Sequence, residues 1–325
     1  MNVLNRRGIY FRRICASLAL IFAISASLSG CQRLVEPENE SISIYATFWP
    51  IYALSDAVMR DIPDAQLKLL AQPQDGCLRD YQLSDWDAAL LSADADAILM
   101  GGRGLESFES LLFGWGESGP AVSAVLYNIE LYNQDDTVNG ESESHLRGGN
   151  PHLYMSLEGA KEIILSASAM LQSLDPQYAK KYVENARNAV EVLDSLLTGN
   201  REALAKYEGK SVILMNEALI YTARDYGLMP TAWIDRESGE NLVDAQLDSC
   251  LERLEASGAR VILIEKQAPQ PLVEALKAQG YAVARLDVLS THRADEGFDR
   301  YAEAQAANAQ AIARAFAEAD GEDEH

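Results

Sequence analysis

The stretch DPQYAKKYVENARNAVEVLDSLL, residues 175–197, lies near the middle of the 325-residue chain and decides how its two halves are joined. Pro176 suits the first turn of a helix, and Gly199 with Asn200 are expected to bend that helix before it resumes. A stiff helix of this length, in place of a Gly/Ser-rich linker, predicts limited movement between the halves. The side chains that recur at helical spacing are Tyr178, Tyr182, Ala186, Ala189, Val190, Leu193 and Leu197.

On both sides of this helix, short apolar runs alternate with amphipathic helical patterns, which is typical of βα units around a parallel sheet. The predicted strands are residues 41–49, 65–73, 95–102, 123–128, 211–216, 229–235, 259–266 and 281–289. The predicted helices between and after them are residues 51–62, 83–93, 104–116, 217–228, 241–258, 270–280 and 300–319. The predicted fold class is therefore α/β, with two four-stranded parallel-sheet α/β lobes joined by one long rigid helix.

The N-terminus has the pattern of a bacterial lipoprotein signal. Residues 14–28 form an uncharged apolar run that is too short to favour a membrane-spanning helix, and it ends in LSGC. Small residues directly before Cys31 match a lipobox, so we expect residues 1–30 to be removed and Cys31 to carry lipid. An uncleaved anchor is the alternative, and it leaves the domain on the same, extracytoplasmic side. Four arginines precede the apolar run: Arg6, Arg7, Arg12 and Arg13.

Six segments are expected after this division. They are a signal peptide (1–30), a lipidated tether (31–41), an N-terminal lobe (42–174) with an acidic loop (133–150), a connecting helix (175–208), a C-terminal lobe (209–319) and an acidic tail (320–325). The formal net charge of −22 disfavours nucleic acid as a partner. We expect a monomer. Cys77 and Cys250 are the two thiols outside the N-terminal segments, and the sequence leaves open whether they form a disulfide.

Polar residues with metal-binding chemistry follow several predicted strands. In open α/β sheets ligands bind at the carboxyl ends of strands, so residues at those ends are the candidates for a site. His152 enters a helical run directly after the acidic loop. The other candidates at strand ends are Asn216, Glu217, Asp287, Cys77 and Arg79.

Several motifs occur in an order and spacing that carry a resemblance. They include YATFWPIYALSDAV (45–58), NPHLYMSLEGAKEI (150–163), VILIEKQAP (261–269) and LDVL (286–289). From about residue 43 to residue 319 the chain resembles the zinc and manganese receptors of bacterial ABC transporters, which are metal-specific solute-binding lipoproteins. The resemblance implies that the protein is not an enzyme. It also implies that the protein captures Zn2+ or Mn2+ between two lobes for an ABC transporter permease.

In that family four side chains hold the metal, usually three histidines and one acidic residue. The resemblance places two of these positions on His152 and Asp287, but the other two fall on Arg79 and Asn216. An arginine has no lone pair to donate, so Arg79 would line the site as a cation and could pair with Asp287. Asn216 is an acceptable oxygen ligand for manganese and a poor one for zinc. Substitute ligands lie close by in the sequence: Glu217, Cys77 and His292.

Two other functions are weighed against metal capture. The first is a surface lipoprotein or adhesin of the same fold, whose site no longer binds a free metal and serves another ligand or partner. The second is an extracytoplasmic hydrolase, but the sequence contains neither a G-x-S-x-G nor an H-E-x-x-H motif. The hydrolase is therefore the weakest of the three hypotheses.

Overall fold

The computed structural model describes residues 41–71, 81–116, 119–126, 131, 149–234, 244–290 and 292–321, with only the backbone for 244–248. The chain divides into two compact units, Met1–Ser41 and Ile42–His325, and every element described below belongs to the second. Within the described residues, no helix is both long enough and apolar enough to cross a membrane. The predicted signal peptide, Cys31, Cys77 and Arg79 all lie outside the described residues, and so does most of the acidic loop.

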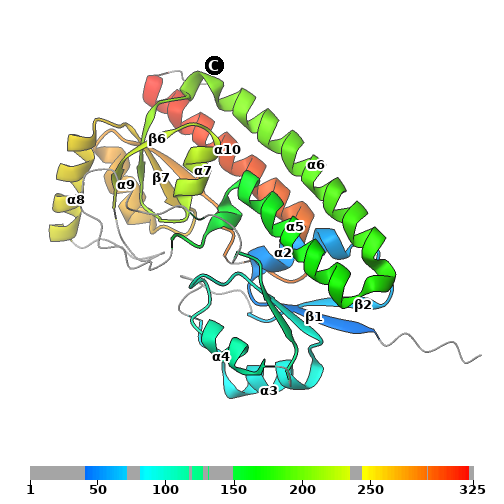
Figure 1. The fold of residues 1–325 in the computed structure, drawn as a ribbon. Helices are drawn as coiled ribbons and strands as arrows, with labels where there is room; N and C mark the ends of the chain where they lie inside the picture. The colour runs from blue at the N-terminus through cyan, green and yellow to red at the C-terminus, as the bar shows by residue number, and fades with distance from the viewer. Residues whose placement is uncertain are drawn as a thin grey trace, which may run out of the picture. The chain divides into compact units, whose positions relative to one another are not determined.

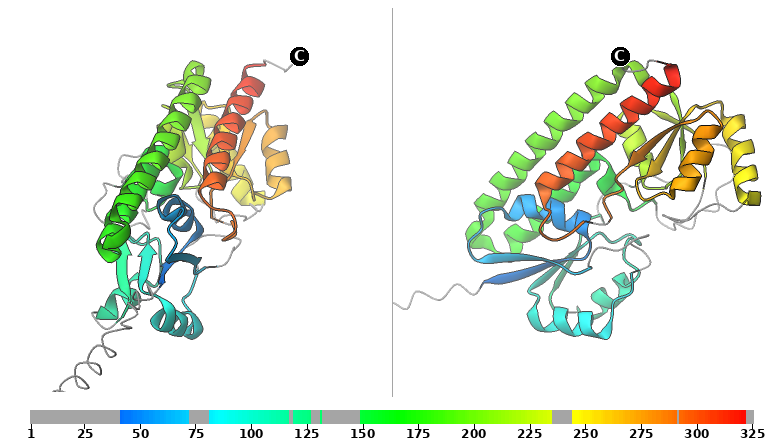
Figure 2. Two further views of the ribbon diagram at one scale, coloured as in Figure 1. Left: turned by 90° about the vertical axis from the view of Figure 1, so that its right-hand side faces the viewer. Right: turned by 180° about the vertical axis from the view of Figure 1, so that it is seen from behind.

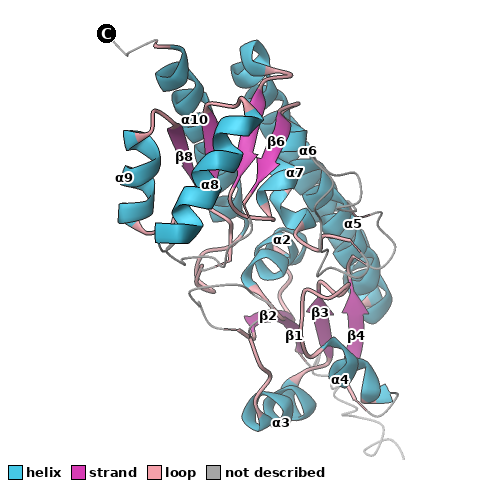
Figure 3. Cartoon of the chain, turned by 90° about the vertical axis from the view of Figure 1, so that its left-hand side faces the viewer, coloured by secondary structure: helices cyan, strands magenta, loops and turns pink. Residues whose placement is uncertain are grey.

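The N-terminal lobe contains the predicted four-stranded parallel sheet. Across the sheet the order is β2 (Ala65–Leu69), β1 (Ile42–Ala46), β3 (Ala97–Met100) and β4 (Ala121–Ala124). Every residue of β3 is buried, which is typical of a central strand in a parallel sheet. Figure 3 shows this sheet together with α3 (Asp85–Asp94) and α4 (Glu109–Gly114).

The C-terminal lobe repeats this plan. Its parallel sheet has the order β6 (Met229–Trp233), β5 (Ser211–Leu214), β7 (Val261–Glu265) and β8 (Ala282–Leu286). The connecting helices are α7 (Leu219–Asp225), α8 (Asp244–Ser257) and α9 (Gln270–Ala278). Each of the eight strands overlaps a run that the sequence predicts, so the predicted fold class is confirmed.

The strand order identifies where a ligand is expected. The order reverses between β1 and β3 in the first sheet and between β5 and β7 in the second. Ligands of open α/β sheets bind beyond the carboxyl ends of the strands at such a reversal. Asn216 follows β5 and Lys266 follows β7, so these two residues flank the reversal in the second sheet.

The joint between the lobes is α6 (Ala179–Leu204), a helix of 26 residues, or about 39 Å at the usual helical rise. Short 3-10 turns, Pro176–Tyr178 and Ala205–Tyr207, flank it. The helix continues unbroken through Gly199 and Asn200, where the sequence suggests a bend. Asn200 Nδ2 donates to the hydroxyl of Tyr226 at 3.0 Å, which fastens this part of α6 to the C-terminal lobe.

Three other helices pack beside α6: α2 (Trp49–Met59), α5 (Leu157–Leu174) and α10 (Phe298–Asp320). Figures 1 and 2 show α5, α6 and α10 running side by side. One continuous apolar cluster includes Ile44 of β1, Leu193 of α6 and Leu286 of β8. Because both lobes contribute to this core, large independent movement of one lobe would expose apolar surface. A second, smaller cluster covers the other face of the second sheet, around Ile262 and Leu276.

The first turn after β3 differs from the prediction. The sequence predicts a helix from residue 104, but α4 begins only at Glu109. The buried carboxylate of Glu106 accepts hydrogen bonds from the backbone N–H groups of Gly101 and Gly102 and from the Thr47 hydroxyl, at 2.6 to 2.8 Å. These bonds close a turn in place of the first helical residues. Burial raises the pKa of Glu106, although the three hydrogen bonds oppose that shift.

Candidate metal centre

His152 lies directly before a single 3-10 turn, Leu153–Met155, and only 5% of its surface is exposed. The Asn150 side chain orients it. Asn150 Oδ1 lies 2.8 Å from His152 Nδ1 and accepts the His152 backbone N–H at 3.0 Å. Asn150 Nδ2 donates to the Glu217 carbonyl at 2.9 Å, so the amide oxygen must be the group that faces the imidazole. His152 Nδ1 is therefore the protonated nitrogen, and the lone pair of the neutral ring is on Nε2.

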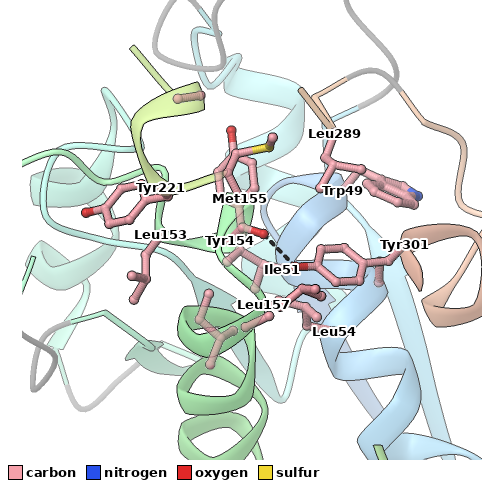
Figure 4. Packing of buried hydrophobic residues seen from close by; sticks show 14 of the residues in the cluster. Trp49, Ile51, Leu54, Leu153, Tyr154, Met155, Leu157, Tyr221, Leu289 and Tyr301 are labelled. Carbon is pink, nitrogen blue, oxygen red and sulfur yellow. Dashed lines mark hydrogen bonds between the residues drawn. The ribbon is translucent and has the colours of Figure 1, made fainter. Parts of the chain in front are cut away.

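Helix α10 holds the segment that follows His152. Figure 4 shows Tyr301 pointing toward Tyr154, and its hydroxyl donates to the Tyr154 carbonyl at 2.6 Å. Gln305 Nε2 donates to the Met155 carbonyl at 3.1 Å. These donors satisfy buried carbonyl groups of the 3-10 turn, so they fix the backbone that positions His152.

Glu217 and Asn216 follow β5, as predicted, and both are half-buried. Glu217 Oε1 lies 3.7 Å from His152 Nδ1, which is the nitrogen opposite the lone pair. Asn216 Oδ1 accepts the Ala218 backbone N–H at 3.0 Å and so closes the turn that begins α7. In this arrangement the Glu217 carboxylate lies on the Nδ1 side of His152, away from the Nε2 lone pair, and Asn216 uses its oxygen locally.

Asp287 follows β8 and is also buried, with 6% of its surface exposed. Asn308 of α10 grips its backbone from both sides: Oδ1 accepts the Asp287 N–H at 2.7 Å, and Nδ2 donates to the Asp287 carbonyl at 2.9 Å. The Leu289 backbone N–H donates to Asp287 Oδ1 at 2.9 Å. The same helix, α10, therefore fixes the backbone at both Asp287 and the His152 segment.

Three cationic or potentially cationic side chains surround Asp287 Oδ2. Lys266 Nζ lies 2.5 Å from it, His292 Nε2 2.9 Å and Arg300 NH2 3.8 Å. Burial alone raises the pKa of Asp287, but the hydrogen bonds from His292 and Lys266, with smaller help from the charge of His292 and from the Leu289 N–H, outweigh it. The pKa is therefore held well below its usual range. Asp287 is an ionised carboxylate that the protein itself already compensates.

His292 belongs to this charged cluster and is buried. Its Nδ1 lies 3.4 Å from Glu296 Oε2, so both ring nitrogens face carboxylates. The ring packs against Trp49 of α2, with ring centroids 4.3 Å apart. Trp49 Nε1 donates to the carbonyls of Arg293 and Glu296, at 3.0 and 2.5 Å. In this orientation His292 supports Asp287, and it would have to rotate away to offer Nε2 to a metal.

The predicted residues thus separate into two described groups, one around His152 and one around Asp287. Among the residues that the structure describes, no three His, Cys, Asp or Glu side chains are grouped as ligands of one metal ion. Cys77, Arg79 and Cys31 fall outside the described residues, so their predicted roles and the predicted Arg79–Asp287 pair stay predictions. Cys250 is buried in the second apolar cluster.

Sequence reasoning missed three residues that shape the site: Lys266, Asn150 and Asn308. Lys266 ends the predicted strand 259–266, and the carboxyl ends of neighbouring parallel strands meet at one edge of a sheet. Its position alone therefore made it a possible site residue. Asn308 is a polar residue on the buried stripe of an alanine-rich helix. Such a residue indicates a buried hydrogen bond, but its partner depends on the tertiary fold.

Comparisons with known proteins find similarity to proteins of metal uptake and metal binding. The family model for the zinc-uptake complex component A, periplasmic, matches residues 44–315. A protein of Treponema pallidum (strain Nichols), whose name ascribes metal binding to it, is 24% identical over 297 residues. That match covers 89% of this chain and 92% of the relative.

Solved structures share the fold. FpvC, a solute-binding protein of Pseudomonas aeruginosa solved with Ni2+, matches with a TM-score of 0.71 and 22% identity over 87% of this chain and 98% of FpvC. Zn(II)-bound AdcA from Streptococcus pneumoniae gives 0.71 and 22% over 85% of this chain and 57% of AdcA. A periplasmic metal-binding protein from Candidatus Liberibacter asiaticus gives 0.67 and 22%, over 84% of this chain and 99% of that protein.

Proposed function

The chain belongs to the family of the periplasmic zinc-uptake complex component A, and from this membership we propose that it captures a divalent transition metal, Zn2+ or Mn2+, between its lobes. Members of this family are solute-binding components of ABC-type uptake systems outside the cytoplasm, and the chain is not an enzyme. In our proposal lipid on Cys31 anchors the protein, which acts as a monomer. It delivers the metal to an ABC transporter permease.

The orientation of His152 is the observation that supports metal capture most directly. A histidine that binds metal through one ring nitrogen usually donates its other N–H to an oxygen, which fixes the tautomer and makes the ligand more basic. Asn150 supplies that oxygen at 2.8 Å. The ring is buried and held on a backbone that α10 fixes, so the entropy of orienting it is lost on folding and not on metal binding.

The chemistry of the candidate ligands suits a borderline divalent metal. His152 offers nitrogen and Asp287 offers an ionised carboxylate, and both zinc and manganese accept these donors. Further candidates from the sequence, namely Asn216, Glu217, His292 and Cys77, would supply the remaining ligands. Arg79 would line the site as a cation.

One observation favours a second function. Lys266 and His292 already donate to Asp287 Oδ2, at 2.5 and 2.9 Å, and so balance its charge without a metal. A family member whose acidic ligand is permanently neutralised would serve as a surface lipoprotein or adhesin that uses the site for another ligand or partner.

Metal analysis separates the two functions. The chain is purified in detergent as its host produces it, its metal content is measured, and the stripped protein is titrated with Zn2+ and with Mn2+. Metal capture predicts one tightly bound ion, with an affinity that His152→Ala and Asp287→Ala each lower by more than about 100-fold, because each removes a ligand. Asp194→Ala, which removes an exposed carboxylate from α6, is the matched control and should bind like wild type. If neither metal binds, the second function stands.

A further inference from the structure

Lys266 lies beside the candidate ligand Asp287 and pairs with its carboxylate. It directly follows β7, and its backbone N–H donates to the Leu286 carbonyl at 2.7 Å, which places it beside the end of β8. Arg285 NH2 donates to the Lys266 carbonyl. The backbone of Lys266 is therefore fixed next to Asp287, and only the side chain is able to move away from the carboxylate.

The Lys266 ammonium shares Asp287 Oδ2, the oxygen that a metal would need, with His292 Nε2 at 2.9 Å. Its Nζ lies 2.5 Å from Oδ2, while Oδ1 accepts the Leu289 N–H at 2.9 Å. A cation bound at Oδ2 would meet this ammonium at close range, and two cations in one partly desolvated place repel each other strongly. Asp287 therefore cannot bind a metal through Oδ2 while Lys266 remains in place.

The unequal exposure of the two side chains explains why the ammonium is able to leave. The Lys266 side chain is 40% exposed, whereas the Asp287 side chain is 7% exposed. An ammonium with this access to solvent regains water when it swings out, which offsets part of the cost of leaving Asp287. Asp287 stays buried and needs a cation in its place, because a buried carboxylate without compensation is costly.

We propose that Lys266 is an internal competitor for the metal, and that capture of a divalent cation at Asp287 is an ion exchange that expels the Lys266 ammonium into solvent. This inference rests on the proposed function and identifies the residue that sets its affinity. Return of the ammonium to Oδ2 compensates Asp287 as the metal leaves, so the same lysine that weakens capture assists release.

Substitution tests the exchange. Zinc and manganese affinities of the whole chain in detergent are measured by competition with a chromogenic chelator for wild type, Lys266→Met and Lys266→Arg. Lys266→Met should bind about tenfold more tightly or better, because one opposing charge is gone. Lys266→Arg keeps a cation and should stay within about threefold of wild type. Lys277→Met removes a lysine from an exposed ion pair with Glu318 in the same lobe, and should match wild type.

A second readout follows the ammonium itself. Wild-type protein is labelled with an amine-reactive reagent, with and without saturating Zn2+, and labelling at Lys266 and Lys277 is quantified by mass spectrometry. Exchange predicts that zinc raises labelling of Lys266 and leaves Lys277 unchanged. Thermal unfolding checks that each variant is folded, and Lys266→Gln replaces Lys266→Met if the latter is not.

The outcomes separate the inference from the proposed function. Metal binding by wild type together with tighter binding by Lys266→Met supports the exchange. If wild type binds metal but Lys266→Met binds equally or less well, or if bound zinc leaves Lys266 labelling unchanged, the exchange is overturned and metal capture stands. If no variant binds either metal, the proposed function fails and the exchange fails with it.

Discussion

The segments around His152 and Asp287 are built alike in their backbones and differently in their charges. Each contains a buried candidate ligand, each is gripped by α10, and each uses an asparagine amide to fix the ligand, Asn150 in one case and Asn308 in the other. Around His152 the partners are one neutral amide oxygen, Asn150 Oδ1, and a carboxylate 3.7 Å away, whereas Asp287 is surrounded by cations. The first segment is therefore prepared to bind a cation, and the second already holds one.

The two asparagines bond to different groups, and substitutions are able to test this difference. Asn308 bonds only to the backbone of Asp287. Asn150 bonds to the backbone and also to the imidazole. Loss of Asn308 should therefore appear mainly as lost stability, and loss of Asn150 mainly as lost metal affinity.

The largest effect is expected from Asn308→Ala. It leaves the buried N–H and carbonyl of Asp287 without their partners, and each such group costs about 1–3 kcal/mol. We expect the free energy of unfolding of the metal-free protein to fall by about 3 kcal/mol, as measured by urea denaturation. Asn188→Ala, at an exposed position of α6, is the control and should change it by less than about 0.5 kcal/mol. Equal stability of the two variants would show that the backbone at Asp287 does not depend on α10.

Asn150→Ala should lower metal affinity more than stability. Without the amide oxygen the His152 ring loses its fixed tautomer, and loss of such a supporting bond typically lowers metal affinity roughly 10- to 100-fold. Asn150→Asp keeps an acceptor for the imidazole N–H but loses the donor to the Glu217 carbonyl, so it should retain more affinity than the alanine variant. Both are measured by zinc titration beside wild type. If Asn150→Ala bound as tightly as wild type, His152 would not be a ligand oriented through Nδ1.

This contrast also explains which parts of the molecule the sequence predicts. Strands such as β3 and β7 are continuous apolar runs, and α6 has a helical apolar stripe, so local patterns were enough to predict the two sheets and the joint. His152 and Asp287 are candidates because each lies within a recognisable motif, and their roles as ligands stay predictions. The sequence offers Arg79 as a cation that could pair with Asp287, and this stays a prediction because Arg79 lies outside the described residues. The end of the strand places Lys266 near Asp287, but the pairing of the two side chains depends on rotamers and strand register that no local pattern encodes. The late start of α4 also depends on a side-chain interaction that a local pattern does not encode, because the Glu106 carboxylate bonds to backbone groups of the preceding turn.

A third effect, on the pH dependence of stability, concerns the helix that follows His152. Asp225 of α7 caps the start of α5: its carboxylate accepts the Ser156 hydroxyl at 2.7 Å and the Leu157 backbone N–H at 2.5 Å. Burial raises the pKa of Asp225 from 3.8 to about 6, although these two bonds and Arg201 oppose the shift. In the folded protein Asp225 therefore binds a proton over a pH range in which the unfolded chain has already lost it.

The direction of the pH dependence follows from this difference. Because the folded state binds more protons between pH 3.8 and about pH 6, the contribution of Asp225 to stability is present at low pH and is lost as the pH rises through about 6. Relative to Asp225→Asn, wild type should lose about 2 kcal/mol of unfolding free energy between about pH 4 and about pH 7. Other titrating groups cancel in this difference, and Asn188→Ala, which changes no titratable group, should differ from wild type by a constant amount. A difference between wild type and Asp225→Asn that stays constant with pH would mean that Asp225 remains ionised beneath α5. Both segments would then contain a buried ionised carboxylate, Asp225 at the start of α5 and Asp287 after β8. The charge contrast between the two segments would then be limited to the candidate ligands and their direct partners.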